Sequence, residues 1–260
     1  MCIRDSYLCI MIYSEEKYYQ LSTIAKTYNY GTILDEIKNH FEYLYNKDEM
    51  DDIALKLQIC IKNSRPMYLH GYVISSALHH YLKNHNYNDI KILETGTARG
   101  FSSIVMARIM EMHNIQGTIH TLDYNDTFDN CLKAAQLKRR VSLNECVEEW
   151  KPLVDKYIVF EKGDSNKKLL ELSNQLSRIH FAFLDGAHYY NDLTNELKFV
   201  EQRQKVGDII ICDDYTQKQF PEIVRAINDF LKNDKYEHTI YYGNDGTKKR
   251  GYVYMKKTKL

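Results

Sequence analysis

Apolar and polar positions along this chain follow two patterns, one typical of buried strands and one typical of helices. From Asn88 onward, short apolar runs bounded by polar residues recur. Between these runs, apolar residues return at helical spacing, as at Phe101, Val105 and Ile109. Strands that alternate with helices predict a mostly parallel sheet covered on both faces. The predicted strands span residues 90–94, 118–123, 157–161, 179–185, 208–213, 238–242 and 252–255.

The last two predicted strands have no helix between them. The segment that joins them contains Gly243-Asn244-Asp245-Gly246, which is typical of a hairpin turn. The predicted fold class is therefore α/β, with a Rossmann-like, doubly wound and mostly parallel sheet of seven strands that ends in an antiparallel hairpin.

The N-terminal third has helical spacing throughout, for example at Leu34, Ile37 and Phe41, and it contains no glycine turn after a strand. We therefore predict a helical cap over residues 1–87 and a Rossmann-like domain over residues 88–260. Roughly the first 6 to 12 residues fit no element, and we expect them to be non-native or disordered. The cap is also a candidate surface for a homo-oligomer.

Composition argues against several classes of function. The formal net charge is zero and the pI is about 7.1, so the chain offers no basic footprint for a nucleic acid. The 6 cysteines lie far apart without a Cys-x-x-Cys pair, which argues against a zinc site and favours a reducing cytoplasm. No apolar run is long enough to span a bilayer, so we expect no membrane partner.

The most informative motif runs from Glu94 through Gly96 and Thr97 to Gly100, where a predicted strand meets a predicted helix. Glycines let the backbone approach a ligand closely, and a helix N-terminus offers unpaired N–H groups. The spacing Glu-x-Gly-x-x-x-Gly differs from the Gly-x-Gly-x-x-Gly of dinucleotide-binding folds. The motif therefore indicates a site for a polar, nucleoside-type cofactor, although a plain strand-to-helix turn has the same appearance.

Each of the first five predicted strands ends in an acid at or near the edge where open α/β sheets bind ligands. Helix capping alone explains one such acid, but it does not readily explain a complete set. A carboxylate after the second strand can accept both hydroxyls of a ribose, and one after the third can accept from an amino group. These acids are Glu94, Asp123, Asp164, Asp185 and the pair Asp213 and Asp214.

The acids that follow the fourth and fifth strands form a second group. Asp185, Asp213 and Asp214 repel one another unless a cation lies among them, and oxygen ligands suit Mg²⁺ or another hard divalent cation. His188 lies three residues after Asp185 and has the ordinary pKa of a general base near neutrality. Two alternatives remain open: the acids accept from water and from helix N-termini, and His188 is a helix-start histidine bonded to a carboxylate.

Taken in order, five motifs resemble class I S-adenosylmethionine-dependent methyltransferases over residues 88–257. The last two look like the branch that contains macrocin O-methyltransferase and cephalosporin hydroxylase-like proteins. The motifs are residues 94–100, Leu122-Asp123, Gly163-Asp164-Ser165, the heptapeptide Phe183-Leu184-Asp185-Gly186-Ala187-His188-Tyr189, and Cys212-Asp213-Asp214-Tyr215.

The resemblance implies roles for the matching residues. For the cofactor, Gly96, Thr97 and Gly100 form the turn around the methionine part, Glu94 orients it, Asp123 holds the ribose, and Asp164 with Ser165 lies on the adenine side. For catalysis, it implies that Asp185, Asp213 and Asp214 ligate Mg²⁺ and that His188, with Asp185, serves proton transfer. The branch has a further acidic ligand earlier in the chain, and the N-terminal third of this sequence contains no acid cluster in a matching context.

These roles predict a cytoplasmic O-methyltransferase that acts, with S-adenosylmethionine and a divalent metal, on a hydroxyl of a sugar or glycosylated small molecule. A cation that binds two neighbouring hydroxyls lowers their pKa and fixes their position. Tyr124, Tyr189, Tyr190 and Tyr215 flank the motifs and are candidates for stacking on an acceptor ring. Two alternatives stay open, a hydroxylase-like relative on the same scaffold and a non-catalytic methyltransferase-like binding module.

Overall fold

The computed structural model describes residues 14–28, 30–58, 66–124, 132–134, 139–244 and 249–260. The sequence also predicts a helical stripe that includes Cys60 and Ile61 and a helix start at Ser64-Arg65. These residues lie outside the described part of the chain, as do the N-terminal segment expected to be non-native and Asp245-Gly246 of the hairpin turn.

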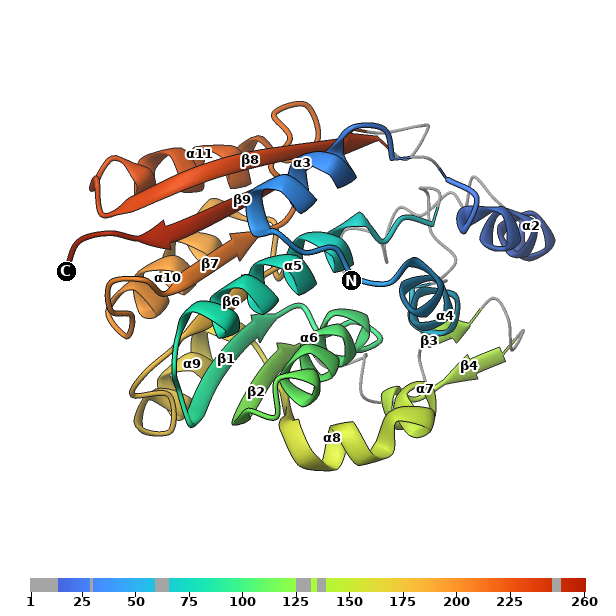
Figure 1. The fold of residues 1–260 in the computed structure, drawn as a ribbon, viewed down its shortest axis with the longest axis horizontal. Helices are drawn as coiled ribbons and strands as arrows, with labels where there is room; N and C mark the ends of the chain where they lie inside the picture. Colours follow the sequence, from blue (N-terminus) through green and yellow to red (C-terminus); the bar gives the residue numbers. More distant parts are fainter. Residues whose placement is uncertain (1–13, 29, 59–65, 125–131, 135–138, 245–248) are drawn as a thin grey trace.

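A seven-stranded sheet forms the centre of the molecule, and the predicted α/β class is confirmed (Figure 1). All seven predicted strands are present within a few residues of their expected ends. The strand order across the sheet is β5-β2-β1-β6-β7-β9-β8. The strands are β1 (Asp89–Thr95), β2 (Gln116–Asp123), β5 (Ile158–Lys162), β6 (Phe181–Leu184), β7 (Ile209–Cys212), β8 (Tyr236–Asn244) and β9 (Lys249–Lys257).

The first five of these strands pair in parallel, and β9 pairs antiparallel with both β7 and β8. Gly243 and Asn244, which the sequence placed in the hairpin turn, are instead the last two residues of β8. They still pair with β9, opposite Arg250 and Lys249. The ladder therefore runs further than the apolar pattern indicated, because paired strand ends need no buried side chains.

Helices cover both faces of the sheet, in agreement with the predicted doubly wound arrangement. Successive residues of a strand point to opposite faces, so Ile92 packs in one core cluster and Leu93 in the other. The first cluster takes residues from α3 (Ile33–Phe41), α4 (Lys47–Leu57), α5 (Leu69–Asn84), α6 (Phe101–Met112) and α8 (Lys151–Tyr157). The second takes residues from α9 (Ser165–Glu171), α10 (Tyr190–Glu201) and α11 (Pro221–Leu231).

The remaining elements are small and include some that the sequence pattern did not predict. They are α2 (Glu15–Ala25), α7 (Leu143–Val147), the 3₁₀ turns Glu148–Trp150 and Leu172–Asn174, and a separate hairpin of β3 (Leu132–Ala134) and β4 (Arg139–Val141). Neither this hairpin nor α9 was predicted. In Figure 1, α2, α4 and the β3–β4 hairpin lie at the right, the side toward which the parallel strands point.

The N-terminal helices pack directly on the sheet and contribute side chains to its hydrophobic core. Phe41 and Leu78 from this part belong to the same buried cluster as Ile92 and Phe183 of the strands. The described part of residues 1–87 contains α2 to α5, and residues of this part share one hydrophobic core with the sheet. Among the described residues, no helix is long and apolar enough to cross a membrane.

A buried ion pair ties α5 to the amino-terminal edge of the sheet. The carboxylate of Asp208, which is fully buried, accepts hydrogen bonds from Arg178 Nη2 at 2.7 Å, Tyr81 Oη at 2.9 Å and the Lys205 backbone N–H at 2.6 Å. Burial raises the pKa of Asp208, and Arg178 is among the groups that oppose this shift. Loss of the negative charge would leave the half-buried guanidinium of Arg178 without its ion-pair partner.

We therefore expect Asp208→Asn to lower the free energy of unfolding by about 2 kcal/mol, measured by denaturant titration. The matched control is Asp155→Asn, which breaks the exposed i,i+4 pair with Lys151 and should leave stability unchanged. Equal stability of the wild type and both variants would show that the buried pair contributes nothing net.

Candidate functional site at the carboxyl edge of the sheet

Glu94 is fully buried beneath the start of α6. It shares the sheet face of Ile92, so its carboxylate meets the first turn of α6, where the hydroxyls of Ser102 and Ser103 each donate to one of its oxygens. Burial raises the pKa of Glu94 to about 7, against the lowering effect of these hydrogen bonds. Glu94 thus fixes the helix that follows the glycine turn.

The turn from Thr95 to Gly100 has the conformation that its glycines permit. Gly96 has φ +91° and Gly100 has φ +81°, both in the left-handed region. A Cβ at Gly96 would overlap the backbone oxygen of Asp185, so this glycine also allows the ends of β1 and β6 to touch. The Thr97 hydroxyl lies 2.6 Å from that of Thr121 and is buried, so it braces the turn against β2.

Asp123, at the end of β2, binds the turn directly. Its Oδ2 accepts from the backbone N–H of Ala98 at 2.7 Å, and its Oδ1 accepts from that of Tyr124 at 2.6 Å. Ala98 has φ +45°, an unusual conformation for a residue with a side chain, and the Asp123 carboxylate holds it there. The half-buried carboxylate therefore shapes the turn and remains at the surface of the edge.

Asp164 is the N-cap of α9, which is the helix-capping role that a single acid after a strand commonly has. Its Oδ1 accepts from the backbone N–H of Lys167 at 3.3 Å. The neighbouring Gly163 donates its N–H to the backbone oxygen of Asp123 at 2.8 Å, so the ends of β2 and β5 are joined. The side chain of Ser165 is among the groups that lower the pKa of Glu196, a buried acid on α10.

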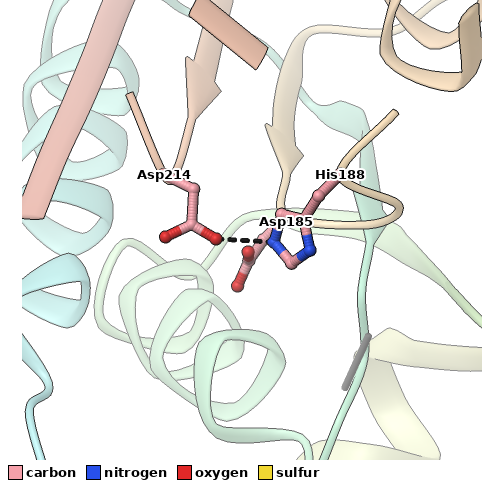
Figure 2. A group of neighbouring side chains, drawn as sticks. All are labelled: Asp185, His188 and Asp214. Carbon is pink, nitrogen blue, oxygen red and sulfur yellow. Dashed lines mark hydrogen bonds and ion pairs between the residues drawn. The ribbon is translucent and has the colours of Figure 1, made fainter. Parts of the chain in front are cut away.

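The structure brings Asp185, His188 and Asp214 together beyond the ends of β6 and β7 (Figure 2). One ligand atom of each side chain lies within 4.8 Å of the others, the spacing expected around one metal ion. His188 Nε2 lies 2.6 Å from Asp214 Oδ2, and the imidazole stacks on Phe220 with centroids 4.5 Å apart. Asp214 has φ +60°, which turns its side chain toward His188.

Asp213 is not part of this three-residue group. It accepts the backbone N–H of Asp214 at 2.5 Å, and its pKa is raised well above the usual range by burial and by the carboxylates of Asp185 and Asp214. Arg250, on β9, lies 3.6 Å from the other oxygen of Asp214 and partly offsets this negative charge. Asp213 is thus beside the group, and its predicted role as a metal ligand remains a prediction.

Sequence analysis missed two charged residues of this edge. Glu196 lies at helical spacing beside Leu193, Leu197 and Val200, on the apolar face of the predicted helix. That position could have indicated that this acid is buried. Arg250 belongs to a basic run near a predicted turn, which looks like solvent-exposed surface. Only the pairing of β9 with β7 brings it to Asp214.

Comparisons with known proteins agree with this geometry. A family model described as a methyltransferase domain matches residues 93–215, which include the glycine turn and the Asp213-Asp214 pair. No curated protein matches the chain in sequence.

Several solved structures share the fold. An O-methyltransferase from Bacillus cereus in complex with SAH has a TM-score of 0.58 and 15% identity, over 94% of this chain and 100% of that one. The O-methyltransferase TomG from Streptomyces achromogenes, involved in tomaymycin synthesis and solved with SAM, has a TM-score of 0.56 and 12% identity. The match covers 88% of this chain and 97% of that one. A proposed O-methyltransferase from Klebsiella pneumoniae has a TM-score of 0.59 and 15% identity, and the match covers 88% of this chain and 97% of that one. At these identities the similarity establishes the fold.

The contact between Gly96 and Asp185 can be tested by substitution. We expect Gly96→Ala to lower the free energy of unfolding by about 3 kcal/mol, because the Cβ strains φ and overlaps the Asp185 carbonyl. Gly31→Ala is the matched control, since Gly31 has φ +70° and nothing within 4 Å of the added Cβ, and it should cost about 1 kcal/mol. Equal losses in chemical denaturation would mean that the Asp185 contact adds no strain.

Proposed function

Because residues 93–215 form a class I, S-adenosylmethionine-dependent methyltransferase domain, we propose that this protein methylates a hydroxyl oxygen of a sugar or a glycosylated small molecule. The observation that carries the proposal is the position of Asp185, His188 and Asp214. The backbone of Asp185 contacts Gly96, so this group lies next to the glycine turn. A group suited to bind and deprotonate a hydroxyl is thus adjacent to the candidate cofactor site.

The residues of the edge fit S-adenosylmethionine. Helix α6 has no side-chain hydrogen bond at its N-cap, Gly100, so its first N–H groups can receive the cofactor's carboxylate. We assign the ribose to the half-buried Asp123 and the adenine side to Asp164 with Ser165. Gly96, Thr97 and Gly100 form the methionine side, where Glu94 acts by fixing α6 rather than by direct contact. The cofactor supplies a sulfonium methyl that is already activated for transfer.

A divalent cation fits between the carboxylates of Asp185 and Asp214, beside His188. One ligand atom of each of these three side chains lies within 4.8 Å of the others, and the nearby acids raise the pKa of Asp213, so added positive charge would be favourable here. Carboxylate oxygens suit Mg²⁺ or Mn²⁺. A cation held at this place would lower the pKa of an acceptor hydroxyl and fix its orientation. Asp213 accepts the backbone N–H of Asp214 and would thereby help to orient Asp214.

His188 is the candidate general base. Asp214 Oδ2 lies 2.6 Å from Nε2 and fixes the ring orientation, while stacking on Phe220 restricts its rotation. An acceptor hydroxyl placed between Asp185 and the imidazole would pass its proton to His188 as the oxygen attacks the methyl group. In-line alignment of that oxygen is the remaining requirement, and the contact between the turn and Asp185 supports it.

Two of the four candidate tyrosines are suited to contact an acceptor ring. Tyr124 and Tyr189 are exposed and adjoin Asp123 and His188 in sequence. The hydroxyls of Tyr190 and Tyr215 instead donate to Asp229 and Asn228 of α11. Exposed aromatic faces at the site favour a sugar or aromatic acceptor.

The metal is tested by methyl transfer from labelled S-adenosylmethionine to a panel of glycosides with neighbouring hydroxyls. We expect chelation to abolish transfer and Mg²⁺ or Mn²⁺ to restore it, without any need for oxygen. Asp185→Asn should also weaken Mn²⁺ binding, measured by electron paramagnetic resonance, at least tenfold, since it removes one charged ligand. Asp234→Asn, at an exposed site paired with Lys259, is the control. Full activity in chelator would refute the metal.

The base is tested by His188→Ala, for which we expect kcat to fall about 10²- to 10⁴-fold while the Kd for S-adenosylmethionine stays unchanged. His238→Ala, which alters an exposed histidine on β8, is the control and should retain full activity. An unaltered kcat would refute the role of base. Loss of Mn²⁺ binding in His188→Ala would instead assign His188 as a metal ligand.

A further inference from the structure

A buried carboxylate that the proposed mechanism does not use lies under the same edge of the sheet. Glu196, on α10, is 1% exposed, and burial raises its pKa to about 7. Among the described residues, its Oε1 has no hydrogen-bond partner. Burial of a carboxyl group destabilises the fold unless hydrogen bonds compensate for the lost hydration, because burial penalises the charged form. The contacts of Glu196 therefore need an explanation.

The first contact of Glu196 is with the cofactor turn. Thr95 lies on the sheet face of Leu93, which is the face that α10 covers, so its side chain points toward α10. The Thr95 hydroxyl donates to Glu196 Oε2 at 2.9 Å, and both groups are buried. Thr95 immediately precedes Gly96, so this bond ties the start of the turn to α10.

The other contacts of Glu196 reach the two neighbouring loops. Ser165, at the start of α9, lies close enough to Glu196 to lower the pKa of this carboxyl. On the third side, a Cβ at Gly186 would lie 3.2 Å from Glu196 Oε1 and 3.1 Å from Thr95, so the loop after Asp185 packs tightly on this pair. Glu196 thus lies against the last residue of β1 and against the segments that follow β5 and β6.

We propose that Glu196 is a positioning residue for the cofactor, which holds the Thr95–Gly96 turn and the Asp164–Ser165 loop at the separation that S-adenosylmethionine requires. The inference rests on the proposed function, since these two loops are the assigned methionine and adenine sides. Glu196 does not touch the cofactor. It acts through Thr95 and Ser165.

The chemistry of the group predicts which substitutions are tolerated. Both neighbours need an acceptor, so Glu196→Leu, of similar volume, removes what they bond to. Glu196→Gln keeps one carbonyl oxygen for Thr95 and resembles the neutral acid. Thr95→Val removes the donor and keeps the shape of the side chain, so it probes the same bond from the other end.

The experiment is calorimetric titration of S-adenosylmethionine into the wild type and these variants, with a double-mutant cycle. We expect Glu196→Leu to raise the Kd about tenfold and Thr95→Val to raise it several-fold, because each removes a buried bond to a carboxylate. Glu196→Gln should stay within about threefold of the wild type. The double variant Thr95→Val/Glu196→Leu should bind no more weakly than Glu196→Leu alone, since the shared bond is already lost.

Controls separate positioning from stability and from the proposed function. Asp208→Asn removes a buried carboxylate at the opposite edge and should lower stability with an unchanged Kd. If Glu196→Leu fails to fold, Thr95→Val and Glu196→Gln carry the test. Wild-type Kd values in folded Glu196→Leu or in Thr95→Val, or additive effects in the cycle, would overturn the inference alone. Failure of the wild type to bind would remove the proposed function together with it.

Discussion

The close approach of the Gly96 turn to the backbone of Asp185 is the constraint on which the rest of this edge depends. Two adjacent parallel strands, β1 and β6, end at the same level, and only a residue without a Cβ fits between them. Backbone bonds continue past the strand ends, from Asp185 N to Thr95 O at 2.9 Å and from Gly96 N to Leu122 O at 2.8 Å. The candidate cofactor turn and the acid–histidine group are therefore parts of one rigid unit, and a shift in one moves the other.

The acids of this edge differ in burial and in the groups that they contact. Glu94 and Glu196 are enclosed, and burial raises the pKa of each to about 7, so they act by holding neighbouring hydroxyls. Asp123 instead accepts a backbone N–H of the turn, and Asp214 contacts His188 and Arg250. The buried acids supply the scaffold.

Much of the fold could be predicted from the periodicity of apolar residues. The ends of the parallel strands were predicted to within about two residues because polar residues bound them, whereas β8 and β9 extend beyond their apolar runs. The β3–β4 hairpin escaped prediction because its three-residue strands are too short to show a period. The acidic edge was predicted as well, since parallel strands carry their final residues to one side. The roles within it were harder to assign: Asp164 caps α9, and Glu94 bonds to Ser102 and Ser103, both contacts with helices that strand spacing does not describe.

The sequence by itself determined the order of strands and helices, the glycine turn, and the position of the acids at the carboxyl edge, because these follow from local patterns of period 2 and 3.6. The tertiary structure decided which acids meet which partners. Asp213 and Asp214 are identical neighbours in sequence, yet it is Asp214, with φ +60°, that joins the group with His188 and Asp185. Likewise, Glu196 meets Thr95, and Arg250 meets Asp214, across long separations in the chain. Contacts between remote residues depend on how strands and helices pack, and no local pattern encodes that packing.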